Sequence, residues 1–140
     1  MSMLQRIVEA LKSRHRPAAL PYLVPGLWVD GRSLTKQAVN PYEFYAHRLQ
    51  EILEMPPQPL VRGREDDDWS PRAIVYNLFP RVTAAYNHAD DGQLRTKPRP
   101  DGWRETGTLL KATALLPYVR GMGFNTVHLL PITSVGQDGK

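Results

Sequence analysis

Side chains that could do chemistry gather in one polar stretch of the sequence, which follows a short apolar run. Asn87, Asp90 and Asp91 offer oxygen atoms at short spacing and are followed by a glycine, and calcium prefers such oxygen ligands. An Asp-Asp-Gly turn explains the same residues without a metal. Tyr86 and Trp103 carry apolar rings with a polar handle, which suits stacking on a ring-shaped ligand as well as anchoring the loop. These residues predict a calcium site and a ligand contact, each beside a purely structural alternative.

Two apolar runs and a helix between them would position this stretch. Residues 73–79 and 125–132 are short β-rich runs without strict alternation, which is typical of strands buried on both faces of a parallel sheet. Residues 107–122 repeat apolar side chains with a helical period, and Pro117 is expected to kink this helix or to restart it. Gly123 then supplies the left-handed residue that ends helices. Since parallel strands need a crossover connection, the order strand, helix, strand predicts a βαβ unit.

The two connections of this unit differ greatly in length. Only Gly123 and Phe124 join the helix to the second strand, whereas the 27 residues 80–106 join the first strand to the helix. Loops of this length are uncommon in compact domains unless they are functional. In parallel α/β architectures, the loops after the carboxyl ends of the strands build the active site. We therefore expect the long loop to lie on the working face, together with its residues Arg81, Tyr86, Asn87, His88, Asp90, Asp91 and Trp103.

The first half of the chain carries the pattern of two helices. Residues 2–14 space their apolar side chains along one face of an amphipathic helix, namely Leu4, Ile7, Val8 and Leu11. A second helix is predicted to begin after Asn40, with Pro41 at its first position and Glu43 completing a capping box. A turn is expected at Asp30, between the two helices.

Composition divides the chain into three parts. The stretch 55–71 holds several prolines and the acidic run Glu65-Asp66-Asp67-Asp68, which disfavour both helix and sheet. We therefore expect a helical N-terminal extension at residues 1–60 and a linker at residues 61–71. The predicted βαβ unit then occupies residues 72–140.

Composition and charge also exclude several classes of protein. The chain has 140 residues, a formal net charge of +4 and no cysteine, which excludes disulfides, thiolate metal sites and cysteine nucleophiles. Its apolar stretches are too short to span a bilayer, and charged residues interrupt the N-terminus. We therefore expect no membrane segment, no signal peptide and a cytoplasmic location. The basic residues are spread thinly, which disfavours a nucleic-acid partner.

The predicted helix and second strand carry a recognisable run of residues. It begins at Gly107 with a leucine-rich helix, continues through Leu116-Pro117-Tyr118-Val119 and Gly121-Met122-Gly123, and ends its strand in Pro131-Ile132. This segment resembles the first helix and second strand of the α-amylase family, glycoside hydrolase family 13. The run 73–81 is similar to the first barrel strand of that family, in which a tyrosine and a following arginine are common, here Tyr76 and Arg81. The resemblance covers residues 73–140.

The resemblance implies a fold, a substrate class and site residues. Members of this family are (β/α)₈ barrels that act on α-glucans, so residues 72–140 would begin such a barrel within an α/β fold. The resemblance also implies weak substrate contacts by Tyr76, Arg81, Tyr86 and Trp103. Some members bind calcium in the loop after the first strand, which adds to the case for a calcium site there.

The catalytic residues of the family have no counterpart in this sequence. The nucleophilic aspartate, the general-acid glutamate and the third essential aspartate follow the fourth, fifth and seventh strands, and only two strands are predicted here. Retaining hydrolysis needs two carboxyl groups about 5 Å apart. Assigning Asp90, Asp91, Asp101 or Glu105 to that pair would contradict the family pattern. We therefore expect an N-terminal fragment of a glycoside hydrolase or transglycosylase, which is inactive as this chain alone.

Two other interpretations stay open. A different enzyme could use a similar half-barrel, because a fold does not fix its chemistry. No glycine-rich phosphate loop follows the first strand, where Pro80 and Arg81 stand instead, and this weakens a nucleotide-binding version. Alternatively, the chain is a small non-catalytic module in which the helices of residues 1–60 bind a partner.

Overall fold

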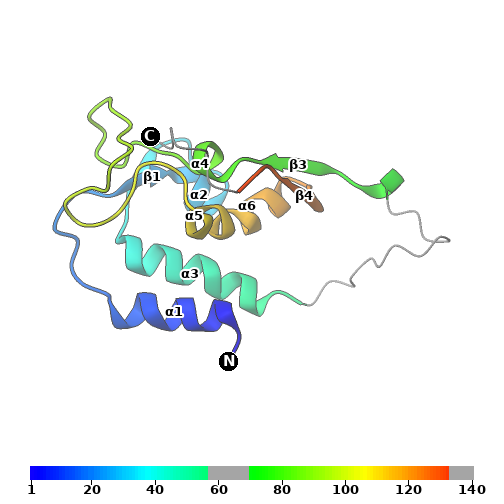
Figure 1. The fold of residues 1–140 in the computed structure, drawn as a ribbon, viewed down its shortest axis with the longest axis horizontal. Helices are drawn as coiled ribbons and strands as arrows, with labels where there is room; N and C mark the ends of the chain where they lie inside the picture. Colours follow the sequence, from blue (N-terminus) through cyan, green and yellow to red (C-terminus); the bar gives the residue numbers. More distant parts are fainter. Residues whose placement is uncertain (57–69, 133–140) are drawn as a thin grey trace.

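The computed structural model describes residues 1–56 and 70–132 and has a mixed α/β arrangement (Figure 1). Two long helices, α1 (Met3–Ser13) and α3 (Pro41–Glu54), pack against each other in antiparallel orientation. They form a layer along one side of the remaining elements. Between them in sequence, β1 (Leu23–Pro25) and β2 (Lys36–Ala38) form an antiparallel pair. The helical pattern predicted for the first half of the chain is confirmed.

The two long helices begin with different caps. Ser2 and Gln5 form a capping box at α1. Ser2 Oγ accepts a hydrogen bond from the backbone N–H of Gln5 (3.2 Å), and Gln5 Oε1 accepts one from the backbone N–H of Ser2 (2.6 Å). At α3 the predicted cap is confirmed, because Asn40 Oδ1 accepts from the backbone N–H two residues later (3.0 Å). The capping box predicted for α3 is wrong. The Glu43 carboxylate instead lies 2.9 Å from His15 Nε2, where it joins α3 to the chain that leaves α1.

The segment between the long helices is more regular than the sequence predicted. β1 runs directly into a short helix, α2 (Gly26–Asp30), which ends at Gly31 in the left-handed conformation (φ 72°). The Asp30 carboxylate accepts from the backbone N–H groups of Arg32 and Ser33, both at 2.8 Å. The hydrogen bonds from Ser33, followed by that from Arg32, lower the pKa of Asp30 to about 2. The turn predicted at Asp30 is therefore confirmed.

The second sheet has the strand order that the sequence predicted. Its two strands pair in parallel, with Val75 opposite Thr126 and Leu78 opposite Leu129. The crossover between them is helical, as a parallel connection requires. The βαβ order is confirmed, whereas a (β/α)₈ barrel stays a prediction, because two strands do not distinguish a barrel from another α/β sheet. The elements of residues 70–132 are, in chain order, the 3₁₀ helix Ser70–Arg72, β3 (Val75–Leu78), α4 (Pro80–Thr83), α5 (Leu109–Ala114), α6 (Leu116–Gly121) and β4 (Thr126–Leu129).

The helix predicted over residues 107–122 forms as two helices, α5 and α6. Leu115 lies between them, and Pro117 stands in the first turn of α6, where its missing N–H leaves no hydrogen bond unmade. The proline therefore restarts the helix, which is one of the two predicted outcomes. Gly123 follows α6 with φ 97°, so the predicted left-handed position is confirmed.

Helices cover only one face of the parallel sheet. Leu78 is 2% exposed and packs with Ala112 and Leu115 of the helical crossover. Val127 and Leu129 pair with Tyr76 and Leu78 and share their face, yet remain 41% and 46% exposed, and Val75 on the opposite face is 45% exposed. This differs from the expectation that both strands are buried on both faces. The reason is that the described part of the chain supplies no third strand and no helix on the opposite side.

The main core lies between the N-terminal helices and the long loop. Ala114 of α5 belongs to this core, and Trp103 of the loop packs against it. Residues 1–56 therefore share a core with residues 70–132. The predicted linker at residues 61–71 falls mostly on residues 57–69, outside the described part of the chain. The buried members of the core are Val8, Leu11, Tyr22, Val24, Phe44, Tyr45, Ala46, Leu49 and Ala114.

Candidate functional site

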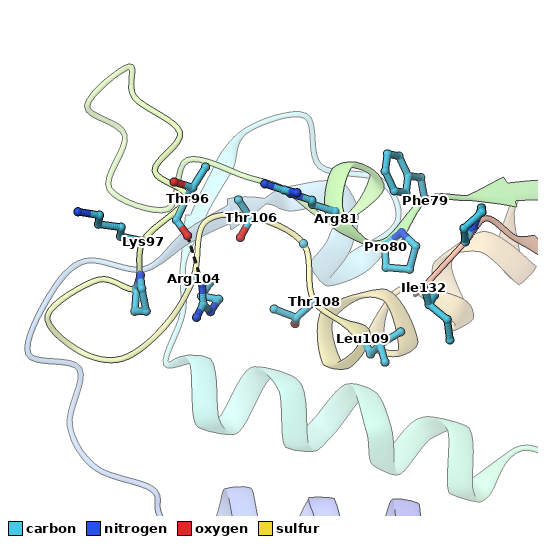
Figure 2. Close-up of a pocket in the computed structure, with 13 residues that line it drawn as sticks. Phe79, Pro80, Arg81, Thr96, Lys97, Arg104, Thr106, Thr108, Leu109 and Ile132 are labelled. Atoms are coloured by element: carbon cyan, nitrogen blue, oxygen red, sulfur yellow. Dashed lines mark hydrogen bonds between the residues drawn. The ribbon is translucent and has the colours of Figure 1, made fainter. Parts of the chain in front are cut away.

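A cleft of about 920 Å³ opens at the carboxyl ends of the two parallel strands (Figure 2). β3 ends at Leu78 and β4 ends at Leu129, so the residues that follow each strand reach the same edge of the sheet. The long loop and the start of α5 complete the walls. The lining residues are Phe79, Pro80, Arg81, Thr96, Lys97, Pro98, Arg104, Thr106, Gly107, Thr108, Leu109, Pro131 and Ile132.

The lining of the cleft is cationic and carries hydroxyl groups. Arg81, Lys97 and Arg104 contribute three positive charges, and none of the described residues that line the cleft is acidic. Hydroxyl groups come from the threonines at positions 96, 106 and 108. Arg104 Nη1 donates to the backbone carbonyl of Thr96 (3.2 Å), which ties two parts of the loop together (Figure 2). Such a lining suits a ligand rich in hydroxyl or anionic oxygen atoms.

Gly107 allows the loop to return close to the end of β3. Its backbone N–H donates to the carbonyl of Arg81 (2.9 Å), and a Cβ at this position would lie 1.7 Å from the carbonyl oxygen of Pro80. The obstacle is backbone rather than a flexible side chain, so only glycine fits here. The next residue, Thr108, caps α5 by accepting from the backbone N–H of Lys111 (3.3 Å). These contacts shape the cleft where loop and helix meet.

Behind the cleft lies a cluster of buried polar side chains. Lys111 and His88 are 2% and 0% exposed, and Lys111 Nζ lies 2.8 Å from His88 Nε2. The same ammonium group donates to the backbone carbonyls of Arg104 and Thr106, and more weakly to that of Glu105 (3.4 Å). These hydrogen bonds from Lys111 hold residues 104–106 of the cleft wall against α5.

The geometry of the cluster assigns the protonation of His88. Nδ1 lies 2.7 Å from the carbonyl oxygen of Leu23, so Nδ1 carries the proton and Nε2 accepts from Lys111. Burial, followed by the nearby Lys111 ammonium, lowers the pKa of His88 to about 3. Burial also lowers the pKa of Lys111 to about 7, although the Glu105 carboxylate acts in the opposite direction. A neutral histidine that faces an ammonium group is therefore the stable arrangement in mildly acidic solution.

The N-terminal part of the chain holds the long loop through this histidine. The Tyr22 ring stacks on His88 with a centroid distance of 3.9 Å, and the backbone N–H of Leu23 donates to the His88 carbonyl (3.0 Å). Farther along the loop, Arg99 Nη2 donates to the carbonyl of Pro21 (2.7 Å). Residues at and before β1 thus position the loop that lines the cleft.

The structure separates the four predicted substrate contacts. Arg81 lines the cleft at the strand ends. Tyr76 packs on the covered face of the sheet, and Tyr86 faces the ring of Trp28 at a centroid distance of 5.6 Å. Trp103 lies against the N-terminal helices, where it also anchors the loop. Of the four residues, only Arg81 reaches the cleft, and a substrate contact by each of them stays a prediction.

The predicted calcium ligands have other partners. Asp90 forms an ion pair with Lys36, and Asp91 forms one with Arg95. Asn87 Oδ1 accepts from the backbone N–H two residues later (3.2 Å), as in a turn. The described ranges contain no group of three or more His, Asp or Glu residues that could hold a metal ion. In this arrangement the three side chains do not fit a calcium centre, and calcium binding stays a prediction.

Sequence reasoning missed most of the cleft and the cluster behind it. The sequence offered no specific prediction for Lys97 and Arg104. The one indication of a cationic site was the excess of positive charge in residues 93–105, which carry four basic and two acidic side chains. Lys111 gave no signal, because a lysine at a polar position of an amphipathic helix normally lies in solvent.

No helix in the described ranges has the length and apolar character needed to cross a membrane. The cytoplasmic location and the absence of a nucleic-acid partner stay predictions. The parallel strand pair, its helical crossover and the cleft at its carboxyl edge give the chain an α/β arrangement with a candidate site at that edge.

Comparison with known proteins gives a distant and partial match. No protein-family model matches the chain. In an alignment of 96 residues that covers 64% of this chain, it is 34% identical to the alpha-1,4-glucan:maltose-1-phosphate maltosyltransferase of Mycobacterium tuberculosis, in two strains of that organism. The chain spans only 12% of the length of these relatives. The match supports, at this coarse level, the resemblance to enzymes of α-glucan chemistry.

Proposed function

We propose that this chain is part of an α-glucan-metabolising enzyme, a glycoside hydrolase or transglycosylase with a (β/α)₈ barrel. Residues 72–140 would contribute the first βαβ unit of that barrel, after the helical N-terminal extension. The observation that carries the proposal is the cleft at the carboxyl edge of β3 and β4, in a chain similar to α-1,4-glucan maltosyltransferases. In barrels of this kind, that edge builds the substrate site.

In this proposal the cleft binds the oxygen atoms of the substrate. Arg81 and Arg104 carry planar guanidinium groups, which bind paired oxygen atoms well. Lys97 adds charge, and the hydroxyl groups of Thr106 and Thr108 both donate and accept. A glucan offers pairs of neighbouring hydroxyl groups. Maltose 1-phosphate, which appears in the name of the relatives, carries a phosphate that would also match the positive charge of the cleft.

The cleft supplies binding groups but no acid–base pair. Retaining transfer of a sugar needs two carboxyl groups about 5 Å apart across the bond that breaks. The described residues that line the cleft include no carboxylate. Glu105 is fully buried behind the wall, where its Oε2 accepts from the backbone N–H of Arg95 (2.8 Å). We therefore assign substrate contacts to this chain and expect no turnover by it alone.

The test is the binding of maltoheptaose and of maltose 1-phosphate to the folded chain, followed through backbone amide NMR signals. We expect both ligands to shift the signals of Gly107 and Thr108, and the phosphate to produce the tighter complex. Arg104→Gln should weaken the phosphate complex, whereas Arg6→Gln at an exposed position of α1 is the matched control. Release of reducing sugar and of phosphate should stay at the level of the blank. A folded chain that binds neither ligand would overturn the proposal.

A further inference from the structure

Two small hollows adjoin each other on the surface that the long loop shares with α1 and α3. Their volumes are about 200 and 370 Å³. Both are lined by Arg16, Tyr42, Asp101 and Trp103, and none of these four residues lines the cleft at the strand ends. Tyr42 and Trp103 therefore lie at the boundary that the two hollows share.

These two rings are fixed in place by the core beneath them. Trp103 stacks on Tyr45 with a centroid distance of 5.3 Å and an interplanar angle of 27°. Tyr42 meets Trp103 edge-on, at 5.2 Å and 76°. Tyr45 is fully buried, whereas Tyr42 and Trp103 are half-buried and line both hollows. Rings that are already ordered lose little conformational entropy when a ligand binds.

Polar groups surround the accessible ring edges. Arg16 donates to the Tyr42 hydroxyl through Nη2 (3.1 Å) and Nε (3.3 Å). The Asp101 carboxylate accepts from the backbone N–H of Trp103 (3.1 Å) and lies 2.9 Å from Arg99 Nη2. The Trp103 indole N–H makes no hydrogen bond to any described residue and is not sealed from solvent. The surface thus combines apolar rings with a free donor, a cation and a carboxylate.

This combination matches the chemistry of a sugar chain. Pyranose rings have apolar faces that stack on aromatic side chains, and their hydroxyl groups bond to planar polar groups such as guanidinium and carboxylate. Small-molecule pockets usually measure about 300–1,000 Å³, so each hollow is at or below the lower end of that range. A ligand that uses both hollows must therefore be extended. The Asp101 carboxylate between them disfavours a polyanion such as a nucleic acid.

We propose that Tyr42 and Trp103 form an accessory binding site for an α-linked glucan chain, which crosses from one hollow to the other over the two rings. The choice of an α-glucan among sugar chains rests on the function proposed above. The long loop connects this site to the cleft, because Lys97 and Arg104 line the cleft while Asp101 and Trp103 line the hollows. A chain held here would keep its substrate close to the cleft.

The test is a titration of the full chain with maltoheptaose, followed through the indole N–H signals of its three tryptophans. Trp103→Phe assigns the signal of Trp103, which we expect to shift together with the amide signal of Asp101. Tyr42→Ala should weaken binding about three- to tenfold, the value of one aromatic contact. Tyr118→Ala on α6, which removes another half-buried tyrosine, is the matched control and should leave the affinity unchanged. Cellohexaose, a β-linked chain, should bind more weakly.

Each other outcome counts against the accessory site. Shifts at Gly107 and Thr108 without a shift at Trp103 would overturn it and leave the proposed function standing. An affinity that is unchanged in Tyr42→Ala, or equal for maltoheptaose and cellohexaose, would also overturn it. If Tyr42→Ala reduces the folded fraction, the pair Tyr42→Phe and Arg16→Gln preserves the ring packing and should weaken binding about threefold. An unchanged affinity in that double variant would overturn the site as well.

Discussion

The region packed between α1, α3 and the long loop differs from the parallel sheet in how completely it covers its apolar residues. Tyr22, Val24 and Leu49 are at most 1% exposed, whereas Val127 and Leu129 are 41% and 46% exposed. In the packed region, helices, a strand pair and a loop surround the core from several directions. The sheet has helices on one face only, and no third strand adjoins it among the described residues. Parallel sheets normally carry a second covering layer, and the further strands of the proposed barrel would supply it.

The cleft takes one wall from each of these two regions. Phe79 and Ile132 extend from the ends of the strands, while Arg104 and Thr106 belong to the loop that Lys111 holds. The loop wall is therefore fixed by contacts within this chain. The strand wall depends on what packs against the sheet. We infer that a ligand meets a preformed loop wall and a more adaptable strand wall.

Shortening one leucine in each region tests the comparison, and this test has the largest expected effect. Leu49→Ala removes a fully buried side chain of α3 and should lower the free energy of unfolding by about 2–5 kcal/mol. Leu129→Ala should cost under about 1 kcal/mol, because its side chain is already half exposed. Denaturant unfolding followed by circular dichroism measures both changes. Equal losses would mean that the sheet is packed as tightly as the helical core.

A methyl group at Gly107 tests the junction between the two regions. Gly107→Ala should lower the free energy of unfolding by about 3 kcal/mol, because its Cβ would overlap the carbonyl oxygen of Pro80 and the backbone must shift. Gly121→Ala is the matched control, since a Cβ there meets nothing within 4 Å. This control should be neutral or stabilising, as alanine favours helix over glycine. Thermal unfolding compares the two variants, and similar melting temperatures would contradict the close approach of loop and strand.

Lowering the pH should destabilise the contacts that hold the long loop within the packed region. Below pH 6.5 the unfolded chain binds a proton at His88, whereas the folded chain resists protonation until a pH of about 3. The unfolded state then binds more protons, so stability falls as the pH falls through this range. We expect a loss of about 2 kcal/mol between pH 6.5 and pH 5, with Lys111 largely an ammonium throughout.

The control for this pH effect compares variants by the slope of their stability against pH, rather than by their absolute free energy of unfolding. His88→Gln keeps an acceptor for Lys111 but cannot titrate in this range, so its stability should depend less on pH than that of the natural chain. His47→Gln replaces a histidine whose side chain is 74% exposed and should leave the slope unchanged. Parallel slopes for the natural chain and His88→Gln would show that His88 is not held neutral by its surroundings.

The features that the sequence alone predicted depend on residues that are close together in the chain. Asn40 caps the helix that follows it, Pro117 restarts its own helix, and Gly123 ends the same unit. The β-rich apolar runs also predicted the two strands, because such residues favour extended backbone, although β4 contains no fully buried residue. Glu43 shows the limit of local reasoning. Its spacing fitted a capping box, yet its partner is His15, far back in the chain.

The candidate site was harder to predict, because its contacts join distant parts of the chain. Arg81 was selected through the resemblance to a barrel strand and does line the cleft. Lys97 and Arg104 looked like an ordinary solvated charge run. Lys111 is buried only because His88 and the backbone carbonyls near Glu105 surround it. Nothing in the local spacing of these residues indicates that they meet.

Asp90→Asn is expected to have the smallest effect, and it tests a solvent-exposed contact within the packed region. The Lys36–Asp90 ion pair joins β2 to the loop with both side chains about half exposed, so its loss should cost under about 1 kcal/mol. Asparagine tolerates the left-handed backbone of Asp90 (φ 56°), which leaves the turn unstrained. The same variant tests the calcium prediction. If Asp90 binds only Lys36, calcium chloride will not stabilise the natural chain more than the variant. If Asn87, Asp90 and Asp91 instead bind the ion, calcium will raise the melting temperature of the natural chain alone, since a ligand stabilises only the state that binds it.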